Sequence, residues 1–499
     1  MASPPTNLHF VLFPWPAQGH LIPMVDIARM LAERDVMVTV ITTPVNTNRI
    51  KTVIDRAIEA KLKIQVLDIQ LPFAKAGLPE GCESFDLIPS ISYVANMFLA
   101  MKLLEEPAEE MLRVLYPPPS CIISDGGFHW TSDVAKRLSI PRIIFYGPGC
   151  FASLCINIVN NTNILDDFKS DLEYFALPGL PDCIEVTKPQ ASSWGKGNTK
   201  ETRETFERTQ EAEKAAFGIV VNSFDALEPK YVEEFAKATG KKVWCIGPVS
   251  LCNKSLEDIA ERGNKAANGE HDCLKWLDSR EPRSVVYVCF GSFSSTLTDQ
   301  AIELALGLES SNIPFVWFVS RTSDEFEKWA SEGQYEDKIK GRGLMVRGWA
   351  PQILVLSHQA IGGFITHCGW NSTLEAVCAG IPMVTWPHFA DQFLNERFIV
   401  NVLKIGLKIG VEVPITYRGK EKFEVMVKRE AIKIAVEGLM NDEDEAQTRR
   451  NRAKEVAQMA KKAMEDGGSS NLNLTKMIVA ITEELALKNK SIEDIVGTL

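Results

Sequence analysis

The feature of this sequence that most restricts its fold is the recurrence of short, apolar, β-branched segments separated by longer amphipathic ones. Continuous apolar character is typical of strands buried on both faces of a parallel sheet, with helices between them. The predicted strands are residues 9–13, 36–42, 63–69, 121–124, 142–146 and 217–223, followed by 284–291, 315–319, 344–349, 362–366 and 383–386. Two such sets predict an α/β protein with two doubly wound domains.

The domain boundaries are predicted from length and from a change in composition. A chain of 499 residues is longer than one hydrophobic core usually serves. Residues 251–272 are polar, charged and poor in apolar side chains, which indicates an interdomain linker. We therefore expect an N-terminal domain over 1–250, a C-terminal domain over 273–470, and a helix over 471–499 that packs back on the N-terminal domain. Its apolar stripe comprises Leu472, Leu474, Ile478, Ile481 and Leu485.

Composition excludes several classes of protein. With 54 Lys and Arg against 65 Asp and Glu, the net charge is −11, so we expect no nucleic-acid partner. The eleven cysteines are dispersed without a CxxC pair, which favours reduced thiols in the cytoplasm. The N-terminus lacks a basic segment, and no run of about 18 apolar residues occurs, so neither a signal peptide nor a membrane span is expected. We expect a monomer.

One turn combines several polar residues with the start of a helix. Residues 364–375 read FITHCGWNSTLE, in which a predicted strand ends just before His367 and a helix follows Gly369. The free N–H groups of a helix start bind phosphate, and a glycine lets a ligand approach the backbone. A structural alternative exists, because Ser372 and Glu375 also match the S-x-x-E capping box. Taken alone, that motif favours the structural interpretation.

A second pair of polar residues follows two other predicted strands. His20 lies in the turn after residues 9–13, and Asp125 ends the strand that begins at 121. A histidine with a pKa near 6.5 can act as a base at neutral pH, and a carboxylate on its far nitrogen would fix its tautomer. The alternatives are a structural or solvated histidine and an aspartate that caps a turn.

The surrounding sequence supports the functional interpretation. Residues 349–392, WAPQILVLSHQAIGGFITHCGWNSTLEAVCAGIPMVTWPHFADQ, closely resemble the signature box of plant UDP-dependent glycosyltransferases that modify small secondary metabolites. The resemblance extends to FPWPAQGH near the N-terminus, the SD at 124–125 and the FGS at 290–292. It implies the GT-B fold, in which two Rossmann-like domains flank a cleft, with the sugar donor in the C-terminal domain and the acceptor in the N-terminal one.

The resemblance also implies a role for each residue of a site that binds UDP-glucose. The residues implied to contact the base and ribose are Trp349, Ala350, Gln352 and Glu375. Those implied to contact the diphosphate are Ser292, His367, Asn371 and Ser372. Those implied to contact the sugar hydroxyls are Trp370, Asp391 and Gln392. His20 and Asp125 match the family's catalytic base and its acidic partner. No metal and no further cofactor are expected; Asp442 and Asp444 are interpreted as solvated surface residues.

The expected activity is inverting, metal-independent transfer of glucose from UDP-glucose to a hydroxyl of a small apolar aglycone. The expected acceptors are triterpenoids, steroids, flavonoids and other phenolics. The sequence is most similar to the subgroup of the family that acts on triterpenoids, steroids and flavonoids. The residues expected to line an apolar acceptor pocket are Trp15, Phe85, Phe98, Phe128, Trp130, Phe151 and Trp194. Tyr146 and Pro148 depart from the subgroup, in which His and Thr are frequent.

Two other classes of protein are alternatives to a glycosyltransferase. A nicotinamide-dependent oxidoreductase requires GxGxxG after a strand, whereas FPWPAQGHLIP has Pro and Gln in place of those glycines. A non-catalytic nucleotide-sugar or metabolite-binding protein would keep the box and lose the base, yet both His20 and Asp125 are present. Absorbance of a bound cofactor and an assay of UDP release would distinguish the three.

Overall fold

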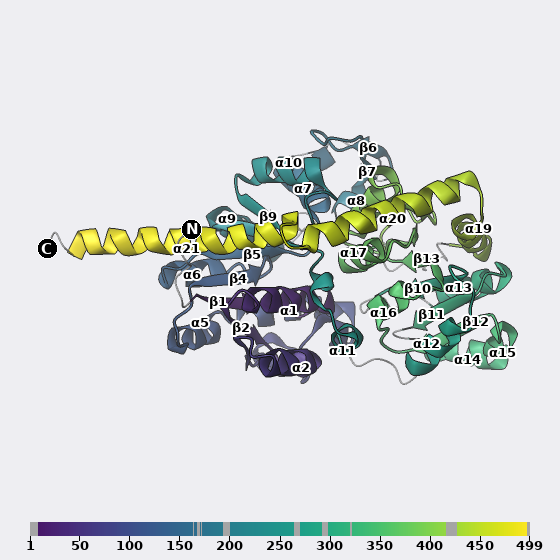
Figure 1. The fold of residues 1–499 in the computed structure, drawn as a ribbon, viewed down its shortest axis with the longest axis horizontal. Helices are drawn as coiled ribbons and strands as arrows, with labels where there is room; N and C mark the ends of the chain where they lie inside the picture. The colour runs from purple at the N-terminus through teal and green to yellow at the C-terminus, as the bar shows by residue number, and fades with distance from the viewer. Residues whose placement is uncertain are drawn as a thin grey trace. The chain divides into compact units, whose positions relative to one another are not determined.

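The computed structural model describes residues 8–162, 164–166, 170, 172–192, 200–263, 270–291, 298–319, 322–415 and 427–496 (Figure 1). These residues form two compact units, each assembled from separate stretches of chain. The first unit comprises Met1–Cys150, Lys196–Lys254 and Lys462–Leu499, and the second comprises Phe151–Gly195 and Ser255–Lys461. This division differs from the one expected from sequence, because residues 151–195 group with the second unit.

The first unit contains a seven-stranded parallel sheet with the order β3-β2-β1-β4-β5-β8-β9. Its strands are β1 (His9–Phe13), β2 (Met37–Thr42), β3 (Ile64–Asp68), β4 (Cys121–Asp125), β5 (Arg142–Tyr146), β8 (Gly218–Val221) and β9 (Lys242–Cys245). Helices assigned to this unit are α1 (Gln18–Ala32), α2 (Pro44–Glu59), α3 (Phe73–Ala76), α4 (Val94–Lys102), α5 (Glu105–Val114), α6 (Thr131–Arg137), α9 (Lys200–Ala215), α10 (Pro229–Thr239) and α21 (Ser469–Val496).

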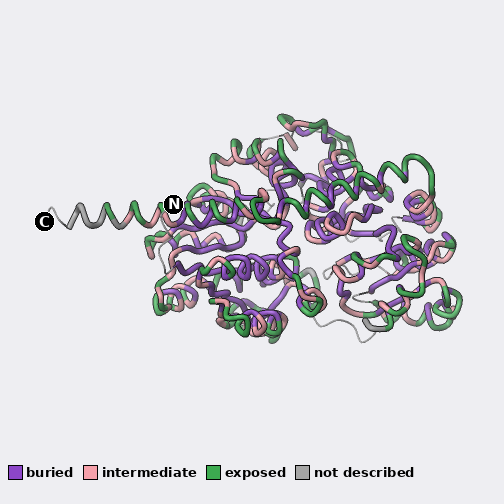
Figure 2. Tube along the Cα trace, in the orientation of Figure 1, coloured by how far each residue is buried: buried purple, intermediate pink, exposed green. Residues whose placement is uncertain are grey.

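Alternation along β1 explains why its sequence is apolar throughout. Phe10 and Leu12 belong to a core that includes residues of α1 and α21. Val11 and Phe13 belong to a second core, which includes residues of α4 and α5. Successive side chains of a strand point to opposite faces, so both faces of this sheet are covered. Figure 2 shows the strands of each unit as buried.

The C-terminal helix α21 packs on the first unit. Ser470 donates a hydrogen bond from Oγ to the carbonyl of Gly247, and Asn473 donates one from Nδ2 to the carbonyl of Cys245 at 3.1 Å. Leu474 and Ile481 are fully buried in the core below. Leu472, which the sequence places on the same stripe, is instead 45% exposed.

The second unit contains a six-stranded parallel sheet with the order β12-β11-β10-β13-β14-β15, and a small antiparallel pair. The strands are β6 (Tyr174–Ala176) paired with β7 (Glu185–Thr187), and β10 (Val285–Cys289), β11 (Phe315–Val319), β12 (Gly343–Arg347), β13 (Ile361–Thr366), β14 (Met383–Thr385) and β15 (Gly406–Lys408). The remaining helices are α7 (Cys150–Asn161), α8 (Lys188–Ser192), α11 (Leu256–Ala260), α12 (Glu270–Asp278), α13 (Thr298–Ser310), α14 (Asp324–Glu332), α15 (Tyr335–Ile339), α16 (Gln352–Ser357), α17 (Trp370–Ala379), α18 (Gln392–Arg397), α19 (Arg429–Met440) and α20 (Asp444–Met464).

Each large sheet has one point at which the strand order reverses. This switch point lies between β1 and β4 in the first unit and between β10 and β13 in the second. Ligands of open α/β sheets bind beyond the carboxyl ends of the strands at such a point. Among the described residues, none of the helices is both long and apolar enough to cross a bilayer.

Candidate active site

A histidine and an aspartate meet at the switch point of the first sheet. Asp125 is the last residue of β4, and His20 follows the neighbouring strand β1. Nδ1 of His20 is bonded to Oδ2 of Asp125. His20 lies in the first turn of α1, which begins at Gln18, rather than in the loop that precedes the helix, where the sequence analysis put it.

The two side chains differ in exposure and are held by several neighbours. Asp125 is 7% exposed, and its Oδ1 accepts a second hydrogen bond from the backbone N–H of Gly127 at 3.3 Å. The His20 side chain is 32% exposed, and its imidazole packs edge to face with the Phe145 ring, with ring centroids 6.4 Å apart. The buried carboxylate therefore fixes the orientation of a histidine that stays open to water.

This arrangement fixes the acid–base chemistry of the histidine. A carboxylate beside Nδ1 favours the tautomer with its proton on that nitrogen, which puts the basic lone pair on Nε2. The carboxylate also stabilises the imidazolium that forms when Nε2 takes up a proton. The pair can therefore remove a proton from a hydroxyl group.

A second polar turn lies at the switch point of the other sheet. Strand β13 ends at Thr366 and α17 begins at Trp370, with Gly369 at the N-cap position. Cys368 has a φ of 64°, an unusual value for a residue other than glycine and one often found at functional sites. A Cβ atom on Gly369 would collide with Nε2 of His367, and one on Gly291 would lie 2.8 Å from its Cε1. Both glycines thus make room for the His367 ring.

Burial keeps His367 uncharged. Desolvation lowers its pKa to about 4, so the imidazole is neutral at pH 7. Its Nδ1 is buried and has no hydrogen-bond partner among the described residues. A neutral ring at the start of a helix can give a hydrogen bond to an anion, and the helix terminus supplies the positive potential.

Glu375, one turn into α17, is the centre of a hydrogen-bond network. Its Oε2 accepts a bond of 2.7 Å from Nε2 of Gln352, which also donates to Oγ of Ser372 at 3.0 Å. Its Oε1 pairs with the guanidinium of Arg262. A capping box would need Ser372 at the N-cap position. The N-cap of α17 is Gly369, and Ser372 lies inside the helix, so the capping-box alternative is wrong.

The loop before α18 is fixed by side chains that the sequence analysis assigned to the sugar. Oε1 of Gln392 accepts hydrogen bonds from the backbone N–H groups of His388 at 2.8 Å and Phe389 at 3.1 Å. Nδ2 of Asn395 donates to Asp391 at 3.0 Å and to the carbonyl of Cys368 at 2.8 Å. Asn395 therefore ties this loop to the turn that carries His367.

The remaining predicted donor residues lie near the same helix starts or outside the described residues. Trp349 follows β12 and is partly exposed, and the carbonyl of Ala350 accepts a bond of 2.8 Å from the N–H of Gln352. Trp370 and Asn371 open α17. Ser292 and Trp194 fall outside the described residues.

Comparison with known proteins identifies the family. The chain is 57% identical over 486 residues to UDP-glycosyltransferase 73E1 of Stevia rebaudiana, an alignment that covers 97% of this chain and 98% of the relative. The model of the UDP-glucoronosyl and UDP-glucosyl transferase family matches residues 206–412. The chain belongs to the UDP-glycosyltransferase family.

Solved structures of the same family share the fold. Glycyrrhiza uralensis UGT73P12, complexed with glycyrrhetinic acid 3-O-monoglucuronide, matches with a TM-score of 0.90 and 35% identity, covering 99% of each chain. Medicago truncatula UGT71G1, complexed with UDP-glucose, matches with a TM-score of 0.75 and 26% identity over 95% of this chain and 98% of that one. The predicted GT-B fold, with two Rossmann-like units, is confirmed.

The aromatic residues expected at the acceptor differ widely in burial. Trp15 stacks on Phe85 with ring centroids 5.6 Å apart, and Phe98 beside them is 45% exposed. Trp130 is 1% exposed and donates its indole N–H to the carbonyl of Met101, so it packs in the core. Phe151 is also 1% exposed and stacks on Phe398 inside the second unit. Phe128, at 3% exposure, packs against Trp15 at 5.0 Å.

Tyr146, the departure from the subgroup noted in the sequence, points away from His20. Its ring packs edge-on against Phe235 at 5.5 Å, and its hydroxyl is hydrogen-bonded to Glu213. Phe145, the preceding residue of β5, faces His20 instead. Because neighbouring strand residues point to opposite faces, the Tyr146 ring lies on the other side of the sheet.

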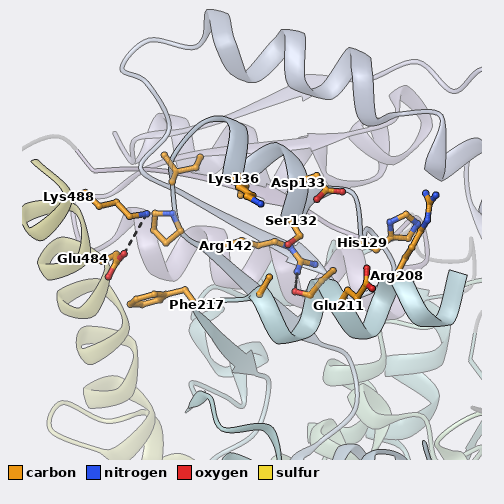
Figure 3. A pocket seen from close by; sticks show the side chains of 15 residues that line it. His129, Ser132, Asp133, Lys136, Arg142, Arg208, Glu211, Phe217, Glu484 and Lys488 are labelled. Carbon is orange, nitrogen blue, oxygen red and sulfur yellow. Dashed lines mark hydrogen bonds and ion pairs between the residues drawn. The ribbon is translucent and has the colours of Figure 1, made fainter. Parts of the chain in front are cut away.

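A polar cavity of about 510 Å³ in the first unit lies apart from the pair of His20 and Asp125 (Figure 3). Arg142 and Phe217, at the amino ends of β5 and β8, line it together with charged residues such as Glu484 and Lys488. The dyad lies at the opposite, carboxyl edge of this sheet. Neither its position nor its charged lining fits an apolar acceptor.

The sequence analysis missed Arg262, and it interpreted two acidic residues near the C-terminus as part of the surface. Arg262 stands in the stretch interpreted as an exposed linker, yet its side chain is only 9% exposed. Asp442, one of the two acids interpreted as solvated, is 95% exposed and pairs with Arg450. Within the described residues, no group of three or more His, Cys, Asp or Glu side chains is arranged to hold a metal ion.

Proposed function

We propose that this glycosyltransferase moves glucose from UDP-glucose to a hydroxyl group of a small, apolar, ring-containing acceptor, with inversion at the anomeric carbon. The observation that carries the proposal is the bond between His20 and the buried carboxylate of Asp125 at the switch point of the first sheet. A binding protein would have no use for a water-accessible histidine oriented in this way.

The proposed reaction is a single displacement. Nε2 of His20 takes the acceptor's hydroxyl proton while the oxygen forms a bond to the anomeric carbon of the sugar. The bond from that carbon to the β-phosphate oxygen breaks, and UDP leaves with the electron pair. Asp125 stabilises the imidazolium, and attack from the face opposite the leaving group inverts the configuration.

Charge that develops on the leaving diphosphate is proposed to be stabilised in the second unit. The start of α17 presents backbone N–H groups, and His367 contributes a neutral hydrogen-bonding ring beside them. Preorganised donors of this kind stabilise an anionic leaving group. We therefore propose that no divalent metal is needed for catalysis.

The donor is proposed to be bound by the network around α17 and α18. Trp349 would stack on the uracil and Glu375 would accept hydrogen bonds from the ribose hydroxyls. The amide of Gln392 would donate to a sugar hydroxyl, because its oxygen is already bonded to the loop backbone. UDP-glucose is the ligand named for Medicago truncatula UGT71G1, a relative with the same fold.

The acceptor is proposed to lie against the exposed end of the aromatic cluster that contains Trp15, Phe85 and Phe98. Trp15 lies in the β1–α1 connection, shortly before His20 in the first turn of α1, so an aglycone stacked there would lie near the base. Ring-containing ligands are also named for related structures, including pterostilbene with Phytolacca americana UGT2. Triterpenoids, steroids and flavonoids are the acceptor classes that fit.

The test is an assay with purified protein, UDP-glucose and a panel of these aglycones, read by UDP release and mass spectrometry. We expect a mass gain of one hexose on at least one aglycone, and NMR of the product should show the β-glucoside. UDP release without glucosylated product, or an α-glucoside, would contradict the proposal.

A further inference from the structure

One buried ion pair in the second unit joins the segment after α11 to the centre of the donor network. Arg262 donates from Nη1 to Oε1 of Glu375, and the two side chains are 9% and 7% exposed. Short helix α11, two residues before Arg262, packs against α16, which begins with Gln352. The guanidinium is therefore fixed next to Glu375, which the proposed function assigns to the ribose, and near the helix that begins with Gln352, which the family resemblance implies to contact the base and ribose.

Each oxygen of the Glu375 carboxylate has a protein partner. Arg262 is bonded to Oε1, and Nε2 of Gln352 is bonded to Oε2 at 2.7 Å. The Gln352 amide is itself held, since its Oε1 accepts from the Tyr287 hydroxyl at 3.2 Å. A carboxylate has about four lone-pair positions, so two remain for a ligand. Two vicinal hydroxyls of one ribose match that number.

We propose that Arg262 is a positioning residue for the nucleotide-sugar, which holds the Glu375 carboxylate in the orientation in which it accepts hydrogen bonds from the ribose hydroxyls. This inference rests on the proposed function, because it takes the ribose to be the ligand of Glu375. A buried carboxylate that loses its charged partner turns toward water, and this change weakens the hydrogen bonds that it accepts from a ligand.

The experiment compares binding of UDP and 2′-deoxy-UDP, measured by isothermal titration calorimetry. The two ligands differ only in the 2′-hydroxyl, so their affinity ratio reports on the ribose contact. We expect wild type to prefer UDP by about tenfold, as for a hydrogen bond to a charged group. Arg262→Gln should weaken UDP binding by about tenfold and 2′-deoxy-UDP binding by much less, so that the preference shrinks.

Three control variants separate positioning from folding. Arg262→Lys, which retains the charge, should restore part of the preference for UDP. In a Glu375→Gln background, Arg262→Gln should have little further effect on the UDP affinity, because the carboxylate through which it acts is gone. Arg429→Gln breaks another Arg–Glu pair of this unit, with Glu303, and should leave both affinities unchanged. Thermal unfolding of each variant establishes that it is folded.

Two results would overturn the role of Arg262 while leaving the donor site intact. Equal loss of both affinities in Arg262→Gln would make the residue purely structural, and tighter UDP binding would make it a competitor of the ribose. A failure of the proposed donor site is distinguishable: wild type would then bind both nucleotides equally, or neither, and the proposal would fall with it.

Discussion

Gly147 leaves the space that the imidazole of His20 occupies. A Cβ atom on this glycine would lie 2.8 Å from Cε1 of His20 and 3.3 Å from Nδ1, closer than ordinary van der Waals contact. Gly147 directly follows β5, whose Phe145 ring faces the same imidazole. Side-chain size at residue 147 is therefore coupled to the position of the proposed base.

Gly147→Ala should consequently lower kcat by roughly 10- to 100-fold, since a base displaced by a fraction of an ångström is poorly placed for proton transfer. UDP affinity should not change, because the residues proposed to bind the donor belong to the other unit. Gly126→Ala is the matched control, since its new methyl group would have only Ile144 Cγ2 nearby, at 3.8 Å. Equal kcat values for the two variants would show that His20 tolerates the displacement.

His20→Ala should abolish nearly all transfer while UDP still binds. A general base typically contributes about 10²- to 10⁴-fold, and His20 is the residue proposed for that role. Asp125→Asn should lose less activity, because it leaves the imidazole in place, but the loss should still be large, since both the charge that stabilises the imidazolium and the control of the His20 tautomer are removed. The measurements are initial rates with one good acceptor and UDP titration by calorimetry. A His20→Ala variant that transfers glucose at the wild-type rate would exclude His20 as the base.

Gly369→Ala should weaken UDP binding by about tenfold or more without unfolding the protein. The new Cβ would collide with Nε2 of His367 and would fill the turn at the start of α17. Both changes remove hydrogen bonds to the diphosphate, each worth roughly a factor of ten. The control is Gly438→Ala in α19, whose methyl group would lie 3.6 Å from Leu407. Undiminished UDP affinity in Gly369→Ala would contradict the assignment of this turn to the diphosphate.

Most strands could be predicted because their apolar runs are continuous and bounded by turn residues. The ranges 9–13, 142–146 and 315–319 are confirmed as predicted. Two strands of the large sheets were missed. β9 is four residues long and begins with an exposed lysine, and β15 has three residues and a single apolar side chain that is only partly buried. Short edge strands of this kind carry little hydrophobic signal.

The polar parts of the site were predicted less completely than the strands. His20 and Asp125 follow strands, and strand ends can be recognised in a sequence. Arg262 stands in a polar stretch, where a buried arginine and a solvated one look alike, and only its three-dimensional pairing with Glu375 distinguishes them. Two backbone N–H groups also donate hydrogen bonds to the Gln392 oxygen. These bonds depend on the conformation of the loop, which cannot be predicted from the spacing of residues in the sequence.

The stability of the protein should fall on mild acidification, in part because of His388. Burial lowers the pKa of this histidine to about 3, with a smaller effect of nearby His367. Between pH 6.5 and 3 the unfolded chain therefore binds a proton that the folded protein does not, so stability decreases as the pH falls through this range. One such group costs about 2 kcal/mol between pH 7 and pH 5.

His388→Phe removes this titration and can retain the stacking on Phe290, which lies 5.3 Å away. The free energy of unfolding is measured by urea titration at pH 7 and at pH 5. Its decrease between these two pH values should be about 2 kcal/mol smaller in the variant than in wild type. An unchanged pH dependence in His388→Phe would show that the ring is charged in the folded state.

UDP-glucose should be preferred over UDP-galactose and over UDP-glucuronate. Asp391 and the Gln392 amide can form hydrogen bonds with the hydroxyls of glucose, which are all equatorial. The axial 4-hydroxyl of galactose would leave buried polar groups unpaired. Such a mismatch costs roughly 1–3 kcal/mol, or about 5- to 150-fold in kcat/KM. UDP-glucuronate should be disfavoured because the residue at position 370 is Trp, which cannot pair with its carboxylate. Values of kcat/KM for the three donors with one acceptor provide the measurement, and equal values for glucose and galactose would contradict the assignment.

Two variants of Gln392 separate its contact with the sugar from its support of the loop. Gln392→Glu keeps an oxygen for the N–H groups of His388 and Phe389 but loses the amide donor. It should lower kcat/KM for UDP-glucose by about tenfold while thermal stability is retained. Gln392→Leu leaves both N–H groups without their acceptor and should lose stability as well, by roughly 1–3 kcal/mol for each buried donor. If Gln392→Glu lost stability and kept its donor preference, Gln392 would support the loop and take no part in recognising the sugar.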